Sequence, residues 1–76
     1  MMRFKQNINL SAFFEQVRKS NGDVWFFTNQ KDQLNLKSQL SQYVFAAAFF
    51  DSEFRLSGNI ICENPADEKL LQDFTE

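Results

Sequence analysis

The sequence contains no histidine, one cysteine, one proline and two glycines. Histidine titrates near neutral pH and is the commonest metal ligand, so its absence argues against acid–base catalysis and metal binding. One thiol cannot close an internal disulfide or a zinc site, and two glycines are too few for a glycine-rich phosphate-binding loop. We therefore predict that the chain is not an enzyme and has no catalytic residue, metal or cofactor.

The sequence also lacks a basic charge excess and a long apolar run. Its formal net charge is −2, whereas a nucleic-acid-binding domain usually carries a basic patch. No apolar stretch approaches the ~18 residues of a membrane-spanning helix, and the first residues lack the apolar block of a secretory signal. Together with the unpaired Cys62, these features predict a cytoplasmic protein that contacts neither nucleic acid nor a membrane.

Phenylalanine, by contrast, is abundant. The 76 residues include ten phenylalanines, one tryptophan and one tyrosine. A chain this short buries only about 60% of its unfolded surface. Buried aromatic side chains offset that limit, because each removes roughly 150–250 Å² from water. We expect residues 1–76 to form a single domain with an aromatic core.

The first part of the chain predicts a strand followed by an amphipathic helix. The short mixed stretch Met1–Ile8 is predicted to be a strand. Apolar residues then recur at helical spacing over Leu10–Asn21, which predicts a helix with one apolar face. Asn9 or Ser11 can cap its start, and Gly22 can end it in the left-handed conformation that glycine adopts easily.

A hairpin is predicted to follow this helix. Val24–Thr28 is β-branched and aromatic, as strands often are. The polar stretch Asn29–Asp32 suits a turn. Leu34 and Leu36 alternate with polar neighbours, which predicts a strand with one dry face.

A second helix is predicted to begin after Ser38 and to extend as far as Phe50. Its inward face is expected to consist of Leu40, Tyr43, Val44 and Ala47. Asp51–Gly58 has no readable pattern. A strand over Ile60–Cys62, in which the cysteine is structural, and a helix opened by Asn64–Pro65 complete the order β-α-β-β-α-β-α. Helices on one face of an antiparallel sheet would bury all the apolar stripes together.

This order of elements resembles the histidine-containing phosphocarrier protein (HPr) family of the bacterial sugar phosphotransferase system. Leu34–Ser38 resembles the segment that ends in the family's regulatory serine. Asp23–Val24 resembles the entry to its second strand, and Ala66–Glu68 resembles the start of its last helix. The resemblance implies an α+β fold, the HPr-like open-faced β-sandwich, with an antiparallel sheet and helices on one face.

The chain departs from the family at the site of phosphate chemistry. The family's phosphate-accepting histidine lies just before the first helix and is followed closely by an arginine and a proline. The matching region here is Gln6–Leu10, which contains none of the three. Gln6 therefore stands at a degenerate phosphocarrier position, because a glutamine amide does not replace imidazole as a nucleophile.

Ser38 is the one position to which the resemblance gives a function. In phosphocarriers of the Gram-positive type, the matching serine is phosphorylated by a dedicated kinase, and the product binds a transcriptional regulator. A phosphate here would meet the N–H groups and the positive dipole end of the predicted helix, beside Lys37. The alternative is that Ser38 is only an N-cap.

Trp25 and Phe27 on the predicted hairpin, together with Lys37 after it, are predicted to form an interaction surface. If Val24 and Phe26 face the helices, Trp25 and Phe27 point to the opposite face of the sheet, because neighbours on a strand alternate. The segment Phe45–Leu56 could fold over them, or a second copy of the protein could pack sheet to sheet against them as a homodimer. An inverted register would instead place them in the core.

We therefore expect a non-enzymatic HPr-like protein without phosphocarrier activity, a regulatory paralogue that binds a protein partner. The resemblance points to a phosphotransferase-system component or a transcriptional regulator as that partner. The alternative is a small dimeric structural or interaction module that has no link to sugar transport.

Overall fold

A computed structural model of the chain describes residues 2–5, 7–28, 32–49 and 51–76. The elements in chain order are α1 (Leu10–Lys19), β1 (Val24–Phe27), β2 (Gln33–Asn35), α2 (Gln39–Ala48), α3 (Ser52–Ser57), β3 (Asn59–Cys62), the 3₁₀ turn η1 (Pro65–Asp67), α4 (Glu68–Leu71) and the 3₁₀ turn η2 (Gln72–Phe74). None of the helices in this described part of the chain is long and apolar enough to cross a membrane.

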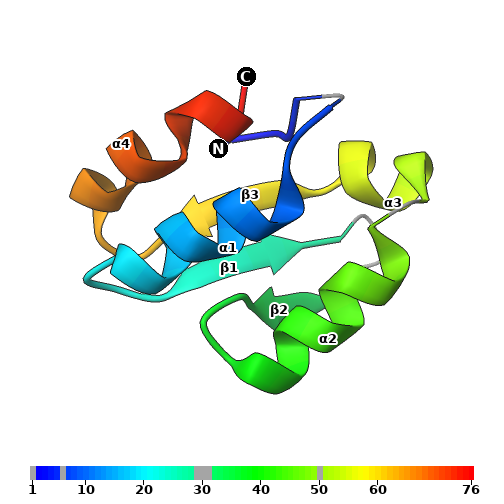
Figure 1. The fold of residues 1–76 in the computed structure, drawn as a ribbon, viewed down its shortest axis with the longest axis horizontal. Helices are drawn as coiled ribbons and strands as arrows, with labels where there is room; N and C mark the ends of the chain where they lie inside the picture. Colours follow the sequence, from blue (N-terminus) through cyan, green and yellow to red (C-terminus); the bar gives the residue numbers. More distant parts are fainter. Residues whose placement is uncertain (1, 6, 29–31, 50) are drawn as a thin grey trace.

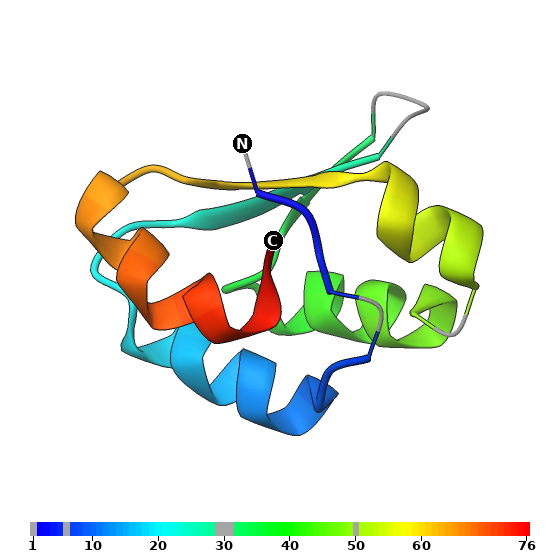
Figure 2. The same cartoon turned by 90° about the horizontal axis from the view of Figure 1, so that it is seen from above.

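The three strands form an antiparallel sheet in the order β2-β1-β3. The central strand β1 places Phe26 opposite Leu34 on one side and Ile60 on the other. Helices α1, α2 and α4 lie on one face of this sheet (Figures 1 and 2). The prediction of an α+β domain with an antiparallel sheet is confirmed.

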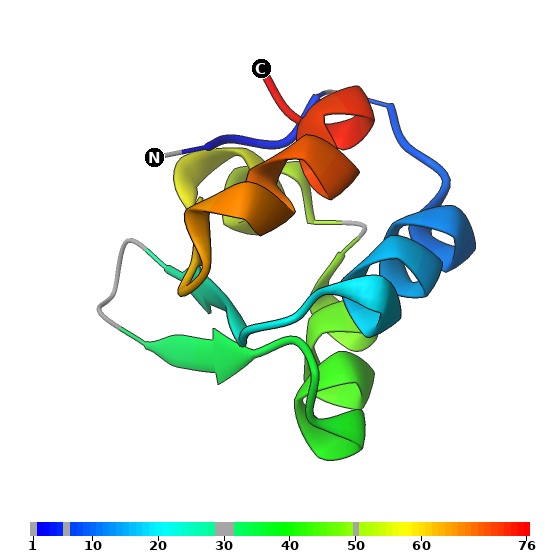
Figure 3. The ribbon, with the colours of Figure 1, turned by 90° about the vertical axis from the view of Figure 1, so that its left-hand side faces the viewer.

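The two ends of the chain meet beside β3. Met2 pairs with Ile60, and Phe4 pairs with Thr75 near the C-terminus. Figure 3 shows both termini on the same side of the molecule. Among the described residues of the predicted strand over Met1–Ile8, the pairing is limited to these two isolated bridges, because the chain pairs with β3 at Met2 and with the C-terminal residues at Phe4.

Helix α1 begins as predicted and ends earlier than predicted. Asn9 caps it, with its Oδ1 accepting a hydrogen bond from the Ala12 N–H at 3.1 Å. The helix ends at Lys19, because the Ser20 backbone turns to an extended conformation and its hydroxyl donates to the Val17 carbonyl at 2.7 Å. Gly22 does not adopt the predicted left-handed conformation.

The stretch without a readable pattern, Asp51–Gly58, contains the short helix α3. The Asp51 side chain caps this helix by accepting from the backbone N–H groups of Glu53 and Phe54 at 3.0 and 3.3 Å. The predicted C-terminal helix is broken into η1, α4 and η2. Its predicted cap is present, because Asn64 Oδ1 accepts from the Ala66 N–H at 3.0 Å.

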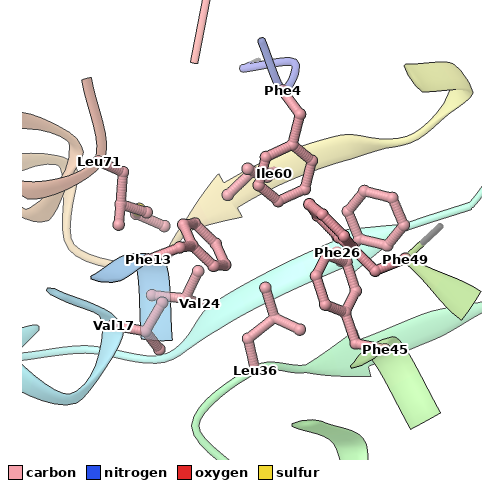
Figure 4. Close-up of a cluster of buried hydrophobic side chains, with 11 residues drawn as sticks. Phe4, Phe13, Val17, Val24, Phe26, Leu36, Phe45, Phe49, Ile60 and Leu71 are labelled. Atoms are coloured by element: carbon pink, nitrogen blue, oxygen red, sulfur yellow. The ribbon is translucent and has the colours of Figure 1, made fainter. Parts of the chain in front are cut away.

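Phenylalanine is the commonest residue of the core between the sheet and the helices, with five of the eleven buried hydrophobic side chains of the described residues (Figure 4). Phe26 of β1 meets Phe45 of α2 edge to face, with ring centroids 5.1 Å apart. Phe45 lies at the centre of this cluster, where its ring also packs against Phe4, Phe13, Phe14, Phe49 and Phe54.

Helix α2 buries a different face from the one predicted. Phe45 is fully buried and Phe49 is 5% exposed, whereas Leu40, Tyr43 and Val44 are 74%, 68% and 50% exposed. The helix carries two apolar stripes and only one can face the sheet. Two phenyl rings remove a large apolar area without polar atoms, whereas a buried Tyr43 hydroxyl would need a hydrogen-bond partner. The prediction for this face was therefore wrong.

Replacing Phe45 with alanine should remove the centre of the ring cluster. We expect Phe45→Ala to lower the free energy of unfolding by about 3–5 kcal/mol, the usual cost of a large cavity in a core. Tyr43→Ala, two positions away on the exposed face, is the matched control and should change it by no more than about 0.5 kcal/mol. Urea denaturation followed by circular dichroism measures both values. Equal losses would contradict the orientation of α2.

Because Gly58 has no side chain, the Phe26 ring can pack directly against its backbone. A Cβ atom at this position would overlap Phe26 Cζ and lie 2.8 Å from the Phe27 carbonyl oxygen. We expect Gly58→Ala to lower the free energy of unfolding by at least about 1–3 kcal/mol, as overpacked cores do. Gly22→Ala, whose nearest neighbour would be Asn64 N at 3.1 Å, should cost less in the same urea titration. The reverse order would contradict this account.

Candidate functional site

Ser38 occupies the N-cap position of α2 without using its side chain as a cap. Its backbone is extended, with φ −80° and ψ 128°, and its side chain makes no capping hydrogen bond. The residue is exposed. The turn before it is instead held by the Asn35 carbonyl, which accepts from the Ser38 N–H at 2.9 Å. The position of the cap is as predicted, but the hydroxyl does not cap the helix.

Lys37 does not reach towards Ser38. Its ammonium group donates a hydrogen bond to the Ser20 carbonyl at 2.8 Å, just beyond the end of α1. Its backbone N–H donates to Asn35 Oδ1 at 3.0 Å. Lys37 therefore joins the β2–α2 junction to the C-terminal end of α1, where a cation also complements the helix dipole.

A buried carboxylate, Asp67, holds the loop that follows α1. It accepts hydrogen bonds from the backbone N–H of Asn21 at 3.0 and 3.1 Å and from that of Gly22 at 2.9 Å. These two N–H groups, with a smaller contribution from the charge of Lys37, lower the pKa of Asp67. Asp67 lies in the segment predicted to begin the last helix. Nothing in the sequence pairs it with residues more than forty positions earlier.

The apolar stripe of α2 that was predicted to face inward is exposed to solvent instead. We call Leu40, Tyr43, Val44 and Ala47 the α2 outer face. A shallow groove of about 250 Å³ runs beside it and is lined by Phe14, Gln39, Gln42, Tyr43 and Ala46. It is smaller than the ~300–1,000 Å³ of ordinary small-molecule pockets.

The open face of the sheet carries the second apolar surface. Val24 and Phe26 are fully buried, whereas Trp25 and Phe27 are half-buried, so the predicted alternation is confirmed. Ile61, 39% exposed, lies opposite Trp25 on β3. The Trp25 indole N–H donates to Glu63 Oε1 at 3.1 Å. We call Trp25, Phe27 and Ile61 the open sheet face.

Two described aromatic residues of the segment that could have covered the open sheet face pack elsewhere. Phe45 and Phe54 both contact Phe26, which points to the helical side of the sheet. The described aromatic residues of this segment therefore do not shield Trp25 or Phe27.

The predicted site residues consequently fall on two surfaces. Ser38 lies at the start of α2 with Lys37 directed to α1, and Trp25 and Phe27 lie on the open sheet face. Gln6, the degenerate phosphocarrier position, lies outside the described residues.

Cys62 is buried in β3 and is a poor nucleophile. Burial raises the pKa of its thiol to about 11, helped by the negative charges of Glu68 and Asp67. The reactive form of cysteine is the thiolate, so this thiol is almost wholly inactive at neutral pH. Within the described ranges, no three histidine, cysteine or acidic residues are grouped to hold a metal ion.

Comparisons of the chain with models of protein families, with curated proteins and with solved structures found no match.

The Asp67 carboxylate should make stability depend on acid pH. Its pKa is lowered in the folded state, so its contribution is present above the ordinary aspartate pKa of about 4 and is lost as the pH falls through the folded-state value. We expect Asp67→Asn to lower the free energy of unfolding at pH 7, and the difference from wild type to shrink towards pH 2. Urea titrations across this range measure it. Asp73→Asn, at an exposed position, is the control. A difference independent of pH would contradict the role of the charge.

Proposed function

We propose that the protein is a non-enzymatic HPr-like paralogue that has lost phosphocarrier activity and works by binding another protein at the Ser38 end of α2. The α+β architecture and the resemblance of Leu34–Ser38 to the family's regulatory segment support this proposal. The observation that carries it is the exposed residue Ser38, whose side chain makes no capping bond and which lies two residues before the exposed Leu40.

Phosphorylation of Ser38 is compatible with the local structure. Because the hydroxyl is not used as a cap, its modification would break no capping hydrogen bond. The first turn of α2 contains no acidic residue, so a phosphate there would meet the positive dipole end without a neighbouring negative charge on the helix. Lys37 would have to release the Ser20 carbonyl before it could contact the phosphate.

The proposed mechanism is a change in the chemistry of one surface. Unmodified, the start of α2 presents a hydroxyl group beside Leu40. Phosphorylated, it presents a dianion beside the same apolar side chain. A partner with an arginine cluster next to an apolar pocket would bind the second form more tightly, because charge-assisted hydrogen bonds to phosphate are strong. By the HPr resemblance, this partner is a phosphotransferase-system component or a transcriptional regulator in the cytoplasm.

A second candidate function is that of a dimeric structural or interaction module with no link to sugar transport. The exposure of Ile61 beside Trp25 favours it, since these residues and Phe27 form an apolar surface on the open sheet face. In that case two copies would pack sheet against sheet, and Ser38 would have no regulatory role.

The proposed function can be tested with a serine kinase of the HPr system and its cognate transcriptional regulator. We expect the kinase to label wild type but not Ser38→Ala. Labelling should tighten binding to the regulator, measured by calorimetry, by about tenfold or more, which corresponds to 1.4 kcal/mol. Ser38→Asp should reproduce part of this gain.

Ser11→Asp, at another exposed serine near a helix N-terminus, is the matched control and should leave binding unchanged. If an authentic phosphocarrier is labelled under the same conditions and Ser38 is not, the regulatory role is wrong.

A further inference from the structure

We propose that the α2 outer face binds the same face of a second copy of this chain, with the two α2 helices antiparallel about a two-fold axis. This inference goes beyond the proposed function and does not depend on the HPr resemblance. It rests on the exposure, the charge and the spacing of the residues on α2.

Large apolar side chains are exposed on the outer side of α2. Helix α2 already packs on the sheet through Phe45, yet Leu40, Tyr43 and Val44 are at least half exposed on its other side. A helix that is apolar on both sides is usually buried on both sides. Contiguous apolar patches on the surface of a protein often mark sites where it binds a partner.

The second relevant property of α2 is that it carries no charged side chain. None of the ten residues of α2, QLSQYVFAAA, is charged, although the chain has eighteen charged residues, eight basic and ten acidic. Helix α1, which lies beside α2, exposes Glu15, Arg18 and Lys19. In a two-fold interface the same patch meets itself, so a charge near the axis would face its own copy. An uncharged face avoids that repulsion, whereas a partner recognised by charge would find nothing on it to pair with.

The spacing of the residues on the α2 outer face suits an antiparallel pair of helices. The α2 outer face is symmetric about the midpoint between Tyr43 and Val44, because Leu40 and Ala47 lie equally far on either side. An antiparallel pair with its axis at this midpoint places Tyr43 opposite Val44 of the second copy, and Leu40 opposite Ala47 of the second copy. Each large side chain thus meets a smaller one, which allows ridges to enter grooves.

The size of this face sets the strength of the dimer. Ten helical residues span about 15 Å, so the face alone falls below the ~800 Å² per partner of a standard stable interface. The dimer should therefore be weak and should form only at high protein concentration.

Sedimentation equilibrium of the full chain tests the inference. We expect the average mass of wild type to rise towards that of a dimer between about 10 μM and 1 mM, and Tyr43→Glu or Val44→Lys to weaken self-association by about tenfold or more. An equimolar mixture of these two variants should regain it. In the mixed pair, the carboxylate introduced at position 43 of one chain lies opposite the ammonium introduced at position 44 of the other, and this rescue should decline in high salt.

Ile61→Lys, on the open sheet face, is the control and should associate like wild type. Thermal unfolding confirms that each variant is folded. A monomer at every concentration, a mixture that does not regain association, or loss of association in Ile61→Lys alone would overturn the inference. Because the experiment contains only this chain, its outcome is independent of whether a regulator or a kinase recognises Ser38.

Discussion

The burial of Phe45 determines how α2 faces the sheet, and therefore which side chains the molecule presents to solvent. Its ring meets Phe26 from the central strand and packs against rings from α1, α3 and the N-terminal segment. Rotating α2 to bury Leu40 and Tyr43 would dismantle this cluster and bring a phenolic hydroxyl into a dry interior. The exposed apolar stripe is thus a direct consequence of the way the core is filled.

The parts of the fold that depend on local chemistry were predictable. Strand alternation placed Val24 and Phe26 inward, and the caps Asn9 and Asn64 begin their helices as expected. The error at the inward face of α2 arose because a longer-range contact decides between local options. Helix α2 has an apolar stripe on each of two sides. Only the contacts with aromatic side chains from distant elements determine which stripe is buried.

The same distinction applies to the candidate site. The sequence correctly places Ser38 at a helix N-terminus and Trp25 with Phe27 on the face opposite the helices. It could not show that Ser38 leaves its hydroxyl unused as a cap, that Lys37 is held by the Ser20 carbonyl, or that Asp67 binds the loop after α1. The Lys37 and Asp67 contacts each join two segments far apart in the chain, which no local pattern encodes.

The division of aromatic types between interior and surface has an optical consequence. The core is lined by phenylalanine, which absorbs and emits weakly in the near ultraviolet, while the single tryptophan is on the open sheet face and the single tyrosine is on the outer side of α2. Intrinsic emission from this protein therefore reports its two exterior apolar surfaces rather than its interior. Quenching or a wavelength change would accompany the arrival of a neighbour on either surface, and the two chromophores would distinguish which one was covered.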